Sequence, residues 1–347
     1  MTSSPRVLVV RLGALGDIVH AIPVAAALRG RWPDARVDWV VEAKHVPLLE
    51  LVPVVSALVP FDSRRVLDGG GWVQTIRALR AAHYDVALDV QGLVKSAVMA
   101  RLSGARRVVG FDTASLREPS ARRLYTEQAG PVGPVHVVAR NLGILTALGV
   151  GSRAWEFPLR ETTAAPGVRA VIERHAGRLA LLNPGAAWPN KRWPAERFGQ
   201  LGRVMAERLG LVPLVLWGPG EEALASAVVG ASGGRAVAGP ETTIGDLAAL
   251  LRAARVMVAG DTGPLHLAAA LGTPVVGIYG PTDPARNGPW SADDVCVSRR
   301  NVCECYHKRT CIAARWCLLD ISVEEMTGAV ERRVKRAATS GVVEPSE

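Results

Sequence analysis

The stretch RVMVAGDTGPLHLAAALGTPVVGIYGPTDPARNGPW, residues 255–290, decides the fold. Its apolar run Val256 to Ala259 is short and rich in β-branched residues, which predicts a buried strand. Pro264 stands where a first helical residue would be, Leu265 to Leu271 supplies helix formers, and Pro274 to Tyr279 is a second apolar run. The stretch therefore predicts a strand–turn–helix–strand unit of an α/β sheet.

The turn inside this unit, Gly260 to Gly263, predicts an anion site. Free backbone N–H groups at the start of a helix commonly bind a diphosphate. Thr262 in the turn and His266, about one helical turn further on, can both reach the same anion. The structural alternative is that the glycines and Pro264 only form the turns of a βαβ crossover, since glycine turns are common in α/β folds.

Composition limits the class of protein. The chain has 347 residues, of which 49% are hydrophobic, enough for two domains and a large core. Its formal net charge of +9 indicates an anionic partner, whether nucleic acid, a membrane or a phosphorylated ligand. The few aromatic residues and the lack of an RNA-binding signature argue against nucleic acid. No apolar run approaches the roughly 20 residues of a membrane span, so we expect a cytoplasmic protein that can rest on a membrane surface.

Strands and helices alternate along the rest of the chain in two successive sets. The first set comprises strands Arg6 to Arg11, Asp38 to Glu42 and Asp85 to Asp89, and helices near Ile18, at Leu48 to Leu58 and at Trp72 to Ala82. The second comprises strands Arg178 to Leu182 and Val212 to Trp217, helices Ala195 to Leu209 and Thr243 to Ala253, and the stretch quoted above.

Gly149 to Gly167 has no clear period and contains two prolines, so we take it as the linker between two domains. The expected architecture is a pair of facing, doubly wound α/β domains, residues 1–160 and 168–322, with a cleft between them. The final helix, Val323 to Ala338, follows the second set and is expected to pack back on the first.

Asp17 ends the loop that joins the first strand to its helix. Ligands of α/β sheets bind at the carboxyl ends of strands, and a helix N-terminus favours an ionised carboxylate, which suits a general base. A plain N-cap aspartate is the structural alternative. The loop has G-x-x-G spacing and lacks G-x-G-x-x-G, so it is a weak dinucleotide signal.

Basic residues outnumber acidic ones by seven to two between positions 95 and 123. They are Lys95, Arg101, Arg106, Arg107, Arg117, Arg122 and Arg123, against Asp112 and Glu118. A solvated face is the ordinary explanation of such a run. Because the run follows a strand end on the rim predicted for Asp17, a wall that binds anions is the alternative.

Three blocks together resemble the family 9 glycosyltransferases, the ADP-heptose–lipopolysaccharide heptosyltransferases. The blocks are RLGALGDIVHAIP (Arg11 to Pro23), NPGAAWPNKRWP (Asn183 to Pro194) and GDTGPLHLAAALGTPVVGIYGPTDP (Gly260 to Pro284). Asp89 to Gly104 and Gly110 to Pro119 look most like the subgroup that adds the first heptose to the Kdo of lipid A. The resemblance implies a GT-B fold, an ADP-heptose donor, inverting transfer without a metal or other cofactor, and an acceptor bound to the first domain.

The resemblance also implies roles for individual residues. Asp17 is the base, Asp261 meets the heptose, and the donor diphosphate and sugar are met by Lys191, Thr262, Gly263 and His266. A glutamate after Trp217 meets the ribose, and both Glu221 and Glu222 stand there, so the choice stays open. An acidic lipid A/Kdo acceptor at the cytoplasmic face of the inner membrane accounts for the basic set Lys95, Arg106, Arg107, Arg117, Arg122 and Arg123.

The chemistry of inverting transfer agrees with these roles. One carboxylate must take the acceptor hydroxyl proton, and fixed positive charge or N–H dipoles must stabilise the departing ADP. Many nucleotide-sugar enzymes use an Asp-x-Asp metal site for the second task, and the sequence contains none. That leaves Lys191 and the helix at Gly263 for the leaving group.

Four cysteines lie close together near the end of the chain: Cys303, Cys305, Cys311 and Cys317, with His307 among them. Their density suggests a zinc site. The paired C-x2-C knuckles of such sites are missing, and a cytosolic setting argues against disulfides, so we expect reduced thiols, with a structural metal as the alternative.

Two other classes of function stay open. One is a different GT-B enzyme, a transferase or epimerase that uses another nucleotide-sugar. The other is a non-catalytic module that binds a membrane surface and has kept the fold.

Overall fold

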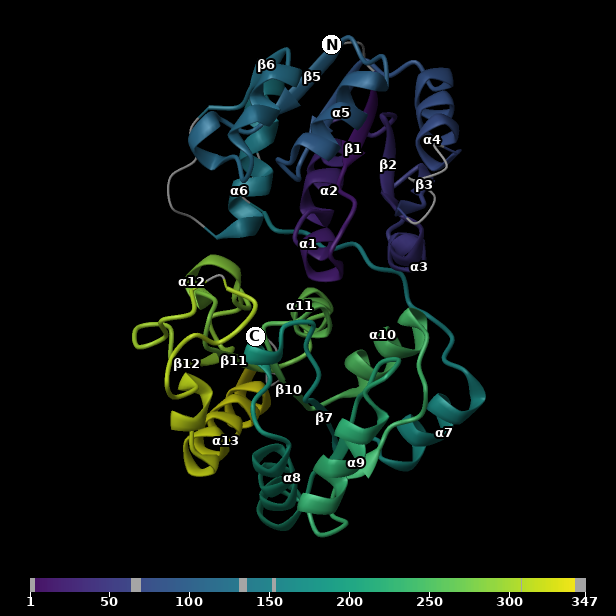
Figure 1. Cartoon of the computed structure of the whole chain (residues 1–347). Helices are drawn as coiled ribbons and strands as arrows, with labels where there is room; N and C mark the ends of the chain where they lie inside the picture. Colours follow the sequence, from purple (N-terminus) through teal and green to yellow (C-terminus); the bar gives the residue numbers. More distant parts are fainter. Residues whose placement is uncertain (1–3, 64–69, 131–135, 152–153, 307, 341–347) are drawn as a thin grey trace, which may run out of the picture. The chain divides into compact units, whose positions relative to one another are not determined.

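The computed structural model describes residues 4–63, 70–130, 136–151, 154–306 and 308–340. The chain divides into two compact units, Met1–Arg160 and Glu161–Glu347, and Figure 1 shows the ribbon of each. The division falls inside the segment predicted as the linker. Each unit is described here by itself.

The first unit is built on a six-stranded parallel sheet in the order β3-β2-β1-β4-β5-β6. Its strands are β1 (Arg6–Val10), β2 (Arg36–Glu42), β3 (Ala57–Phe61), β4 (Val86–Asp89), β5 (Arg107–Gly110) and β6 (Glu127–Gln128). Its helices are α1 (Leu15–Val19), α2 (Ile22–Arg31), α3 (Val46–Leu49), α4 (Gly70–Ala81), α5 (Val94–Leu102) and α6 (Val137–Gly143), with short 3-10 turns η3 (Thr113–Ser115) and η4 (Pro119–Leu124). Leu8 and Val10 of β1 pack with Met99 of α5 and Leu79 of α4, so these two helices cover one face of the sheet.

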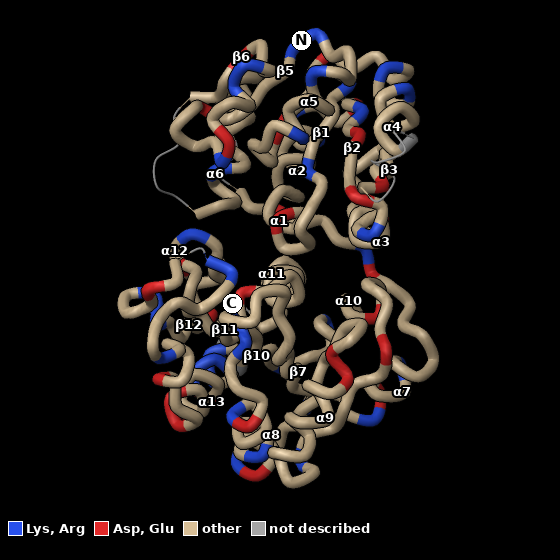
Figure 2. Tube along the Cα trace, viewed as in Figure 1, with Lys and Arg blue, Asp and Glu red and all other residues tan. Residues whose placement is uncertain are grey.

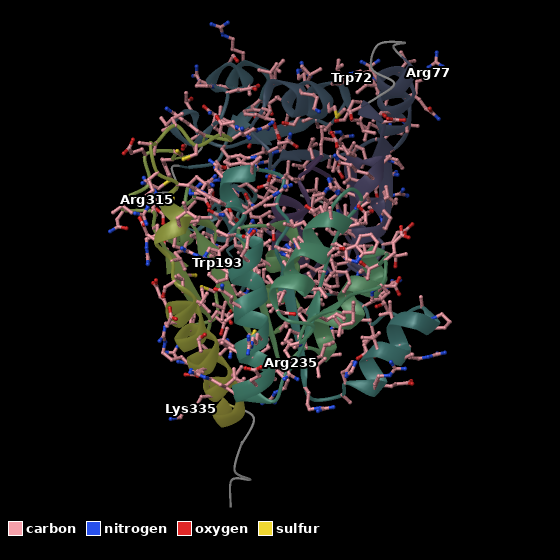
Figure 3. The ribbon with its side chains drawn as sticks, turned by 60° about the horizontal axis from the view of Figure 1, so that its bottom comes forward. Trp72, Arg77, Trp193, Arg235, Arg315 and Lys335 are labelled. Carbon is pink, nitrogen blue, oxygen red and sulfur yellow. The ribbon has the colours of Figure 1, made fainter. Side chains whose placement is uncertain are left out.

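The second unit repeats this plan with strand order β12-β11-β10-β7-β8-β9. Its strands are β7 (Leu179–Asn183), β8 (Val212–Val215), β9 (Val237–Ala238), β10 (Val256–Gly260), β11 (Val275–Tyr279) and β12 (Val295–Ser298). Its helices are α7 (Pro166–Arg174), α8 (Ala195–Leu209), α9 (Glu222–Ala231), α10 (Ile244–Ala253), α11 (Gly263–Ala270), α12 (Pro284–Asn287) and α13 (Val323–Ser340), with 3-10 turns η6 (Pro189–Lys191) and η7 (Cys317–Asp320). Trp193, labelled in Figure 3, is 1% exposed and belongs to the core between the sheet and α8.

The strand order reverses at one place in each sheet. In the first unit this place lies between β1 and β4, and in the second between β7 and β10. The connections on either side of such a point run in opposite directions, and the crevice that opens at the carboxyl ends of the two strands is where doubly wound folds bind ligands. Each unit therefore offers one such position.

The predicted α/β class of two doubly wound units is confirmed, but some predicted elements are wrong. Leu48 to Leu58 is not a helix: α3 ends at Leu49, two turns follow, and Ala57 begins the strand β3. The strands β5 and β6 were missed in and after the basic run, and α7 occupies the end of the predicted linker.

The final helix packs on the second unit, whereas the sequence led us to expect that it packs back on the first. Met326, Ala329 and Val330 of α13 are fully buried in the core that also contains Val276 and Ile278 of β11. Arg333 adds a buried ion pair, its Nε 2.7 Å from Asp294 Oδ1, just before β12. Within the described ranges, no helix is both long and apolar enough to cross a bilayer.

Candidate active site

The carboxylate of Asp261 lies at the centre of a polar cluster in the second unit, at the point where its strand order reverses. Asp261 follows β10 directly and is 7% exposed. Lys191 Nζ lies 2.5 Å from its Oδ2, while His266 Nε2, at 3.0 Å, and Asn287 Nδ2, at 2.7 Å, contact Oδ1. Residues from η6, α11 and α12 thus converge on one carboxylate.

This environment holds Asp261 ionised. Burial by itself would raise the pKa of a carboxyl group, but the contacts with His266 and the Lys191 ammonium outweigh burial and hold the pKa of Asp261 well below its usual range. Lys191 is fixed from its other side, because its Nζ lies 4.4 Å from the centroid of the Trp188 ring. The cluster is a preformed set of charges with little freedom to move.

The local sequence explains why the turn has this shape. A Cβ at Gly260 would stand 2.7 Å from the carbonyl oxygen of Lys191, so only glycine lets the η6 segment approach the end of β10. Thr262 is the residue before α11, Gly263 is its first residue, and Pro264 lies in its first turn, where no N–H is needed. The amide of Asn183, at the end of β7, donates to Thr262 Oγ1 at 3.4 Å and ties the two strand ends together.

A pocket of about 240 Å³ adjoins this turn. Its lining includes Asn183 and Pro264 at the turn, Trp217 and Glu221 after β8, and Thr243 at the start of α10. The pocket combines an apolar wall, an aromatic ring and two carboxylates, those of Glu221 and Glu241, at the carboxyl ends of parallel strands. Such a composition suits the base and ribose of a nucleotide.

Of the two candidate glutamates, Glu221 is the one that lines the pocket. Its Oε2 accepts a hydrogen bond from the Gly218 N–H at 3.1 Å, and its Oε1 lies 3.7 Å from Arg192 Nη2. The Glu222 side chain instead accepts from Gly220 N–H at 3.4 Å in an exposed setting at the start of α9. The geometry favours Glu221 for a ribose contact, a choice that the sequence left open.

Asp17 lies at the corresponding position of the first unit, in α1 after β1. Its side chain is 46% exposed, with Oδ1 2.8 Å from Arg11 Nη2 and Oδ2 accepting from Ala14 N–H at 3.2 Å. Arg11 is buried and also donates to the Val90 carbonyl oxygen at 2.7 Å, just after β4. The buried Arg11 guanidinium therefore orients the Asp17 carboxylate, which stays partly open to solvent.

Part of the basic run gathers on the same edge of the first sheet. Arg117 and the η4 residues Arg122 and Arg123 are exposed and follow the carboxyl end of β5. Glu118 ties this segment to the start of α5, because its carboxylate accepts from Val94 N–H at 2.7 Å. Lys95, the next residue of α5, turns its ammonium toward β2 and β3 instead: Nζ lies 3.8 Å from Glu42 Oε1 and 5.6 Å from the centroid of the Phe61 ring. Figure 2 shows the charged positions of these elements.

Arg106 and Arg107 lie elsewhere, which corrects the prediction of one common rim. They precede and begin β5, so they stand at the amino end of a parallel strand, the edge opposite to Asp17. Arg107 is also engaged: its Nε and Nη2 contact the Glu127 carboxylate at 2.7 Å, and Nη2 donates to Ala147 O at 2.8 Å. These two arginines are not brought together with Arg117 and the η4 residues.

The four late cysteines are free thiols that gather around Cys305. Its Sγ lies 3.3 Å from Cys311 Sγ and accepts from Ile312 N–H at 3.1 Å. Burial raises the pKa of the Cys317 thiol to about 12. His307 lies outside the described residues, and within those residues no three metal-binding side chains are grouped so as to hold an ion.

Sequence reasoning missed three residues that the geometry brings to these sites: Arg11, Asn183 and Asn287. All three lie inside or next to the quoted blocks. Their polar side chains at strand ends, or just after the GPTDP segment, were the available signal. Their partners, however, are up to 79 residues away, as in the bond from Arg11 to Val90, and only the fold identifies them.

Comparison with known proteins agrees with this geometry. A family model described as glycosyltransferase family 9 (heptosyltransferase) matches residues 72–317. Lipopolysaccharide heptosyltransferase 1 of Pseudomonas aeruginosa is 32% identical over 317 residues, which cover 88% of this chain and 87% of that protein.

Two solved structures are similar over almost their whole length. A family 9 glycosyl transferase from Veillonella parvula has a TM-score of 0.84 at 23% identity and covers 97% of this chain and 99% of its own. The Escherichia coli heptosyltransferase WaaC with ADP has a TM-score of 0.77 at 25% identity and covers 94% and 99%. The GT-B fold class and the resemblance drawn from the three blocks are therefore confirmed, and this chain belongs to glycosyltransferase family 9, the heptosyltransferases.

Proposed function

We propose that this enzyme transfers heptose from ADP-heptose to the Kdo of the lipid A inner core of lipopolysaccharide. The observation that carries the proposal is the Asp261 cluster next to the Glu221 pocket, at the carboxyl ends of β7 and β10. Relatives named as lipopolysaccharide heptosyltransferases support the reaction. One solved relative is described as WaaC with ADP-2-deoxy-2-fluoro heptose, which supports the donor.

The donor is proposed to bind the second unit. Adenosine occupies the 240 Å³ pocket with its ribose on Glu221, and the diphosphate faces the N–H groups at Gly263 and the ammonium of Lys191. Asp261, held as an acceptor of hydrogen bonds, takes the heptose hydroxyls. His266 and Thr262 complete the contacts with the diphosphate and sugar.

Asp17 is proposed as the general base. Its ionised carboxylate removes the proton of the acceptor hydroxyl as that oxygen attacks the anomeric carbon from the face opposite to ADP, so the configuration inverts. Lys191 and the N-terminus of α11 stabilise the negative charge that develops on the departing ADP, without a metal. Arg11 keeps the Asp17 carboxylate in one orientation.

The acceptor is proposed to bind the first unit. Arg117, Arg122 and Arg123 form what we call the η4 face, and their positive charge, together with that of Lys95 at the start of α5, matches Kdo carboxylates and lipid phosphates. Arg106 and Arg107 are left out of this face because they stand at the other edge of the sheet. The enzyme would meet this acceptor at the cytoplasmic surface of the inner membrane.

Donor profiling tests the proposal against the other classes. Titration calorimetry should show binding of ADP and ADP-heptose and much weaker binding of UDP and UDP-sugars. Preference for a UDP-sugar would indicate another transferase or an epimerase. Tight vesicle binding by a protein that binds no nucleotide would indicate the non-catalytic module.

A further inference from the structure

Exposed apolar side chains gather in one segment of the second unit. Of the six large hydrophobic side chains that are exposed among the described residues, three lie within eleven positions: Val302 (57% exposed), Tyr306 (39%) and Ile312 (57%). They belong to the segment between β12 and η7, residues 299–306 and 308–316, which we call the cysteine loop. Exposed apolar groups scattered singly need no explanation, whereas a group of them marks an interaction surface.

The three residues lie close to Cys305 along the chain or through its thiol, and Cys305 is 1% exposed. Tyr306 is its neighbour in the chain, and Val302 stands three positions before it, after a turn closed by the bond from Val302 N–H to Arg299 O at 3.2 Å. Ile312 is drawn back to the same point, because its N–H donates to Cys305 Sγ at 3.1 Å. The three apolar residues are thus near neighbours of one buried thiol.

The loop is also braced against the rest of the unit. The Asn190 amide donates to Lys308 O at 2.9 Å, and Trp316 Nε1 donates to Asn190 O at 3.1 Å. Cys303 and Cys317 are buried in the core that contains Trp193. The apolar side chains are therefore exposed on an anchored loop rather than on a frayed one.

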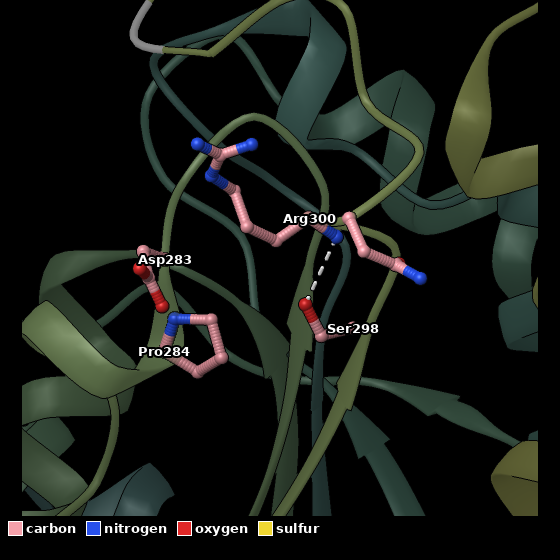
Figure 4. Close-up of a pocket in the computed structure, with 5 residues that line it drawn as sticks. Asp283, Pro284, Ser298 and Arg300 are labelled. Carbon is pink, nitrogen blue, oxygen red and sulfur yellow. Dashed lines mark hydrogen bonds between the residues drawn. The ribbon is translucent and has the colours of Figure 1, made fainter.

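Positive charge surrounds them. The loop carries Arg299, Arg300, Lys308, Arg309 and Arg315 against Glu304, five basic residues and one acidic residue. Arg299 is paired with Glu325 of α13, so the other four carry the argument. Arg300 stacks on the Tyr306 ring, its Cζ 3.6 Å from the centroid. With Asp283, Pro284, Ser298 and Asn301 it also lines a hollow of about 540 Å³ (Figure 4). Figure 3 shows Arg315 projecting from the outer edge of the ribbon, where it pairs with Asp320.

We infer that the cysteine loop docks this enzyme on an anionic lipid surface. Apolar side chains that enter the acyl boundary, ringed by Lys and Arg that meet acidic headgroups, are the chemistry of an interfacial membrane contact. A protein partner would have to match the charged and apolar groups of the loop residue by residue. An anionic lipid surface presents negative headgroups and apolar acyl chains over its whole area. The inference rests on the proposed membrane location, yet it does not depend on the transfer reaction or on the η4 face.

Vesicle sedimentation tests it. Full-length protein should bind vesicles of phosphatidylglycerol and phosphatidylethanolamine and leave phosphatidylcholine vesicles unbound. Val302→Ser with Ile312→Ser should weaken binding at least tenfold. Lys308→Glu with Arg315→Glu should weaken it more, since each basic residue near an anionic surface changes partition by about fivefold.

Matched controls are present in the same chain. Val73→Ser with Val237→Ser removes two valines that are 51% and 48% exposed and should leave vesicle binding unchanged. Arg174→Glu with Arg235→Glu reverses two exposed charges of the second unit and should weaken binding by less than the loop pair does. ADP binding, measured by calorimetry, should be the same in all four variants.

Three results would overturn the inference: vesicle binding that the loop variants retain, binding lost equally in the controls, or a loop variant that only changes oligomeric state. The vesicles contain neither Kdo nor lipid A, and the assay measures no transfer. A negative result in vesicle sedimentation therefore does not contradict the proposed reaction. A negative transfer assay likewise does not contradict the lipid contact of the loop.

Discussion

Asn287 illustrates how much of the site depends on single side chains. Its Nδ2 donates to Asp261 Oδ1 at 2.7 Å, the third contact on a carboxylate that Lys191 and His266 also hold. A hydrogen bond to a charged group contributes about 1.5–3 kcal/mol. Asn287→Ala should therefore lower kcat/KM for ADP-heptose by about ten- to a hundredfold and change ADP affinity little.

Steady-state kinetics and ADP calorimetry check this prediction, with Asn301→Ala as the control for loss of an exposed amide. Unchanged kinetics in a folded Asn287→Ala protein would remove Asn287 from the site. An equal loss of ADP affinity would mean that it acts on the nucleotide and not on the sugar.

Asp17→Asn should keep the fold and ADP affinity, because Arg11 Nη2 can still donate to the amide oxygen. Turnover should fall by about 10²–10⁴-fold, the usual contribution of a general base. Asp34→Asn, an exposed aspartate of the same unit, should have no effect. Near-normal turnover in Asp17→Asn would exclude Asp17 as the base.

The sequence identified residue types better than residue partners. It predicted that a carboxylate, a lysine and a histidine would share one site, and the fold brings Asp261, Lys191 and His266 together. It did not separate Glu221 from Glu222, because adjacent residues differ only in the direction of their side chains. It also grouped Arg107 with Arg122, since chain proximity does not reveal the opposite ends of a strand.

At the scale of elements, the loop that follows β7 lies close to the loop that follows β8, and this contact shapes the proposed ribose site. A Cβ at Gly185 would lie 2.2 Å from Glu221 Oε2, so the carboxylate can hold its place only beside glycine. Gly185→Ala should displace the flexible end of the Glu221 side chain at little cost in stability. Loss of one hydrogen bond to this carboxylate should weaken ADP binding by about tenfold.

Gly230→Ala is the control, because a Cβ there meets nothing within 4 Å. Calorimetry gives ADP affinity and thermal unfolding gives stability. Unaltered ADP affinity in Gly185→Ala would place the ribose away from Glu221.

The η4 face gives a second prediction about elements. Reversal of Arg117, Arg122 and Arg123 to Glu should raise the KM for a lipid A acceptor and flatten its dependence on salt, because these contacts are charge-assisted. Arg106→Glu, at the opposite edge of the sheet, should do neither. A Kd for ADP that changes with the η4 face would contradict the assignment of donor and acceptor to different units.

Strong periodic elements were predicted well and weak ones were not. Helix α8 has the predicted bounds, Ala195–Leu209, because its apolar stripe and its terminal Gly210 are clear signals. The strand β3 was missed because Ala57–Phe61 is partly exposed along most of its length, and β5 because its four residues begin with an arginine. Short strands owe their existence to a neighbouring strand, which the local sequence does not reveal.

At the scale of the whole molecule, two units of the same strand order each present a reversal point with one carboxylate that we propose to act in the reaction, Asp17 or Asp261. Because Lys191 and α11 are proposed to stabilise the leaving group, transfer should persist in excess EDTA once metal content has been checked. Loss of transfer with an intact fold would contradict metal independence. Unfolding by EDTA would instead show that the cysteines hold a structural metal.

The most direct test of the central claim is transfer from ADP-heptose to Kdo-lipid A, followed by mass spectrometry of the acceptor. The account predicts an acceptor heavier by one heptosyl residue, with release of ADP, for the wild-type enzyme, and almost no product in the same time for Asp17→Asn. An unmodified acceptor, from wild-type protein that is folded and binds ADP-heptose, would contradict it.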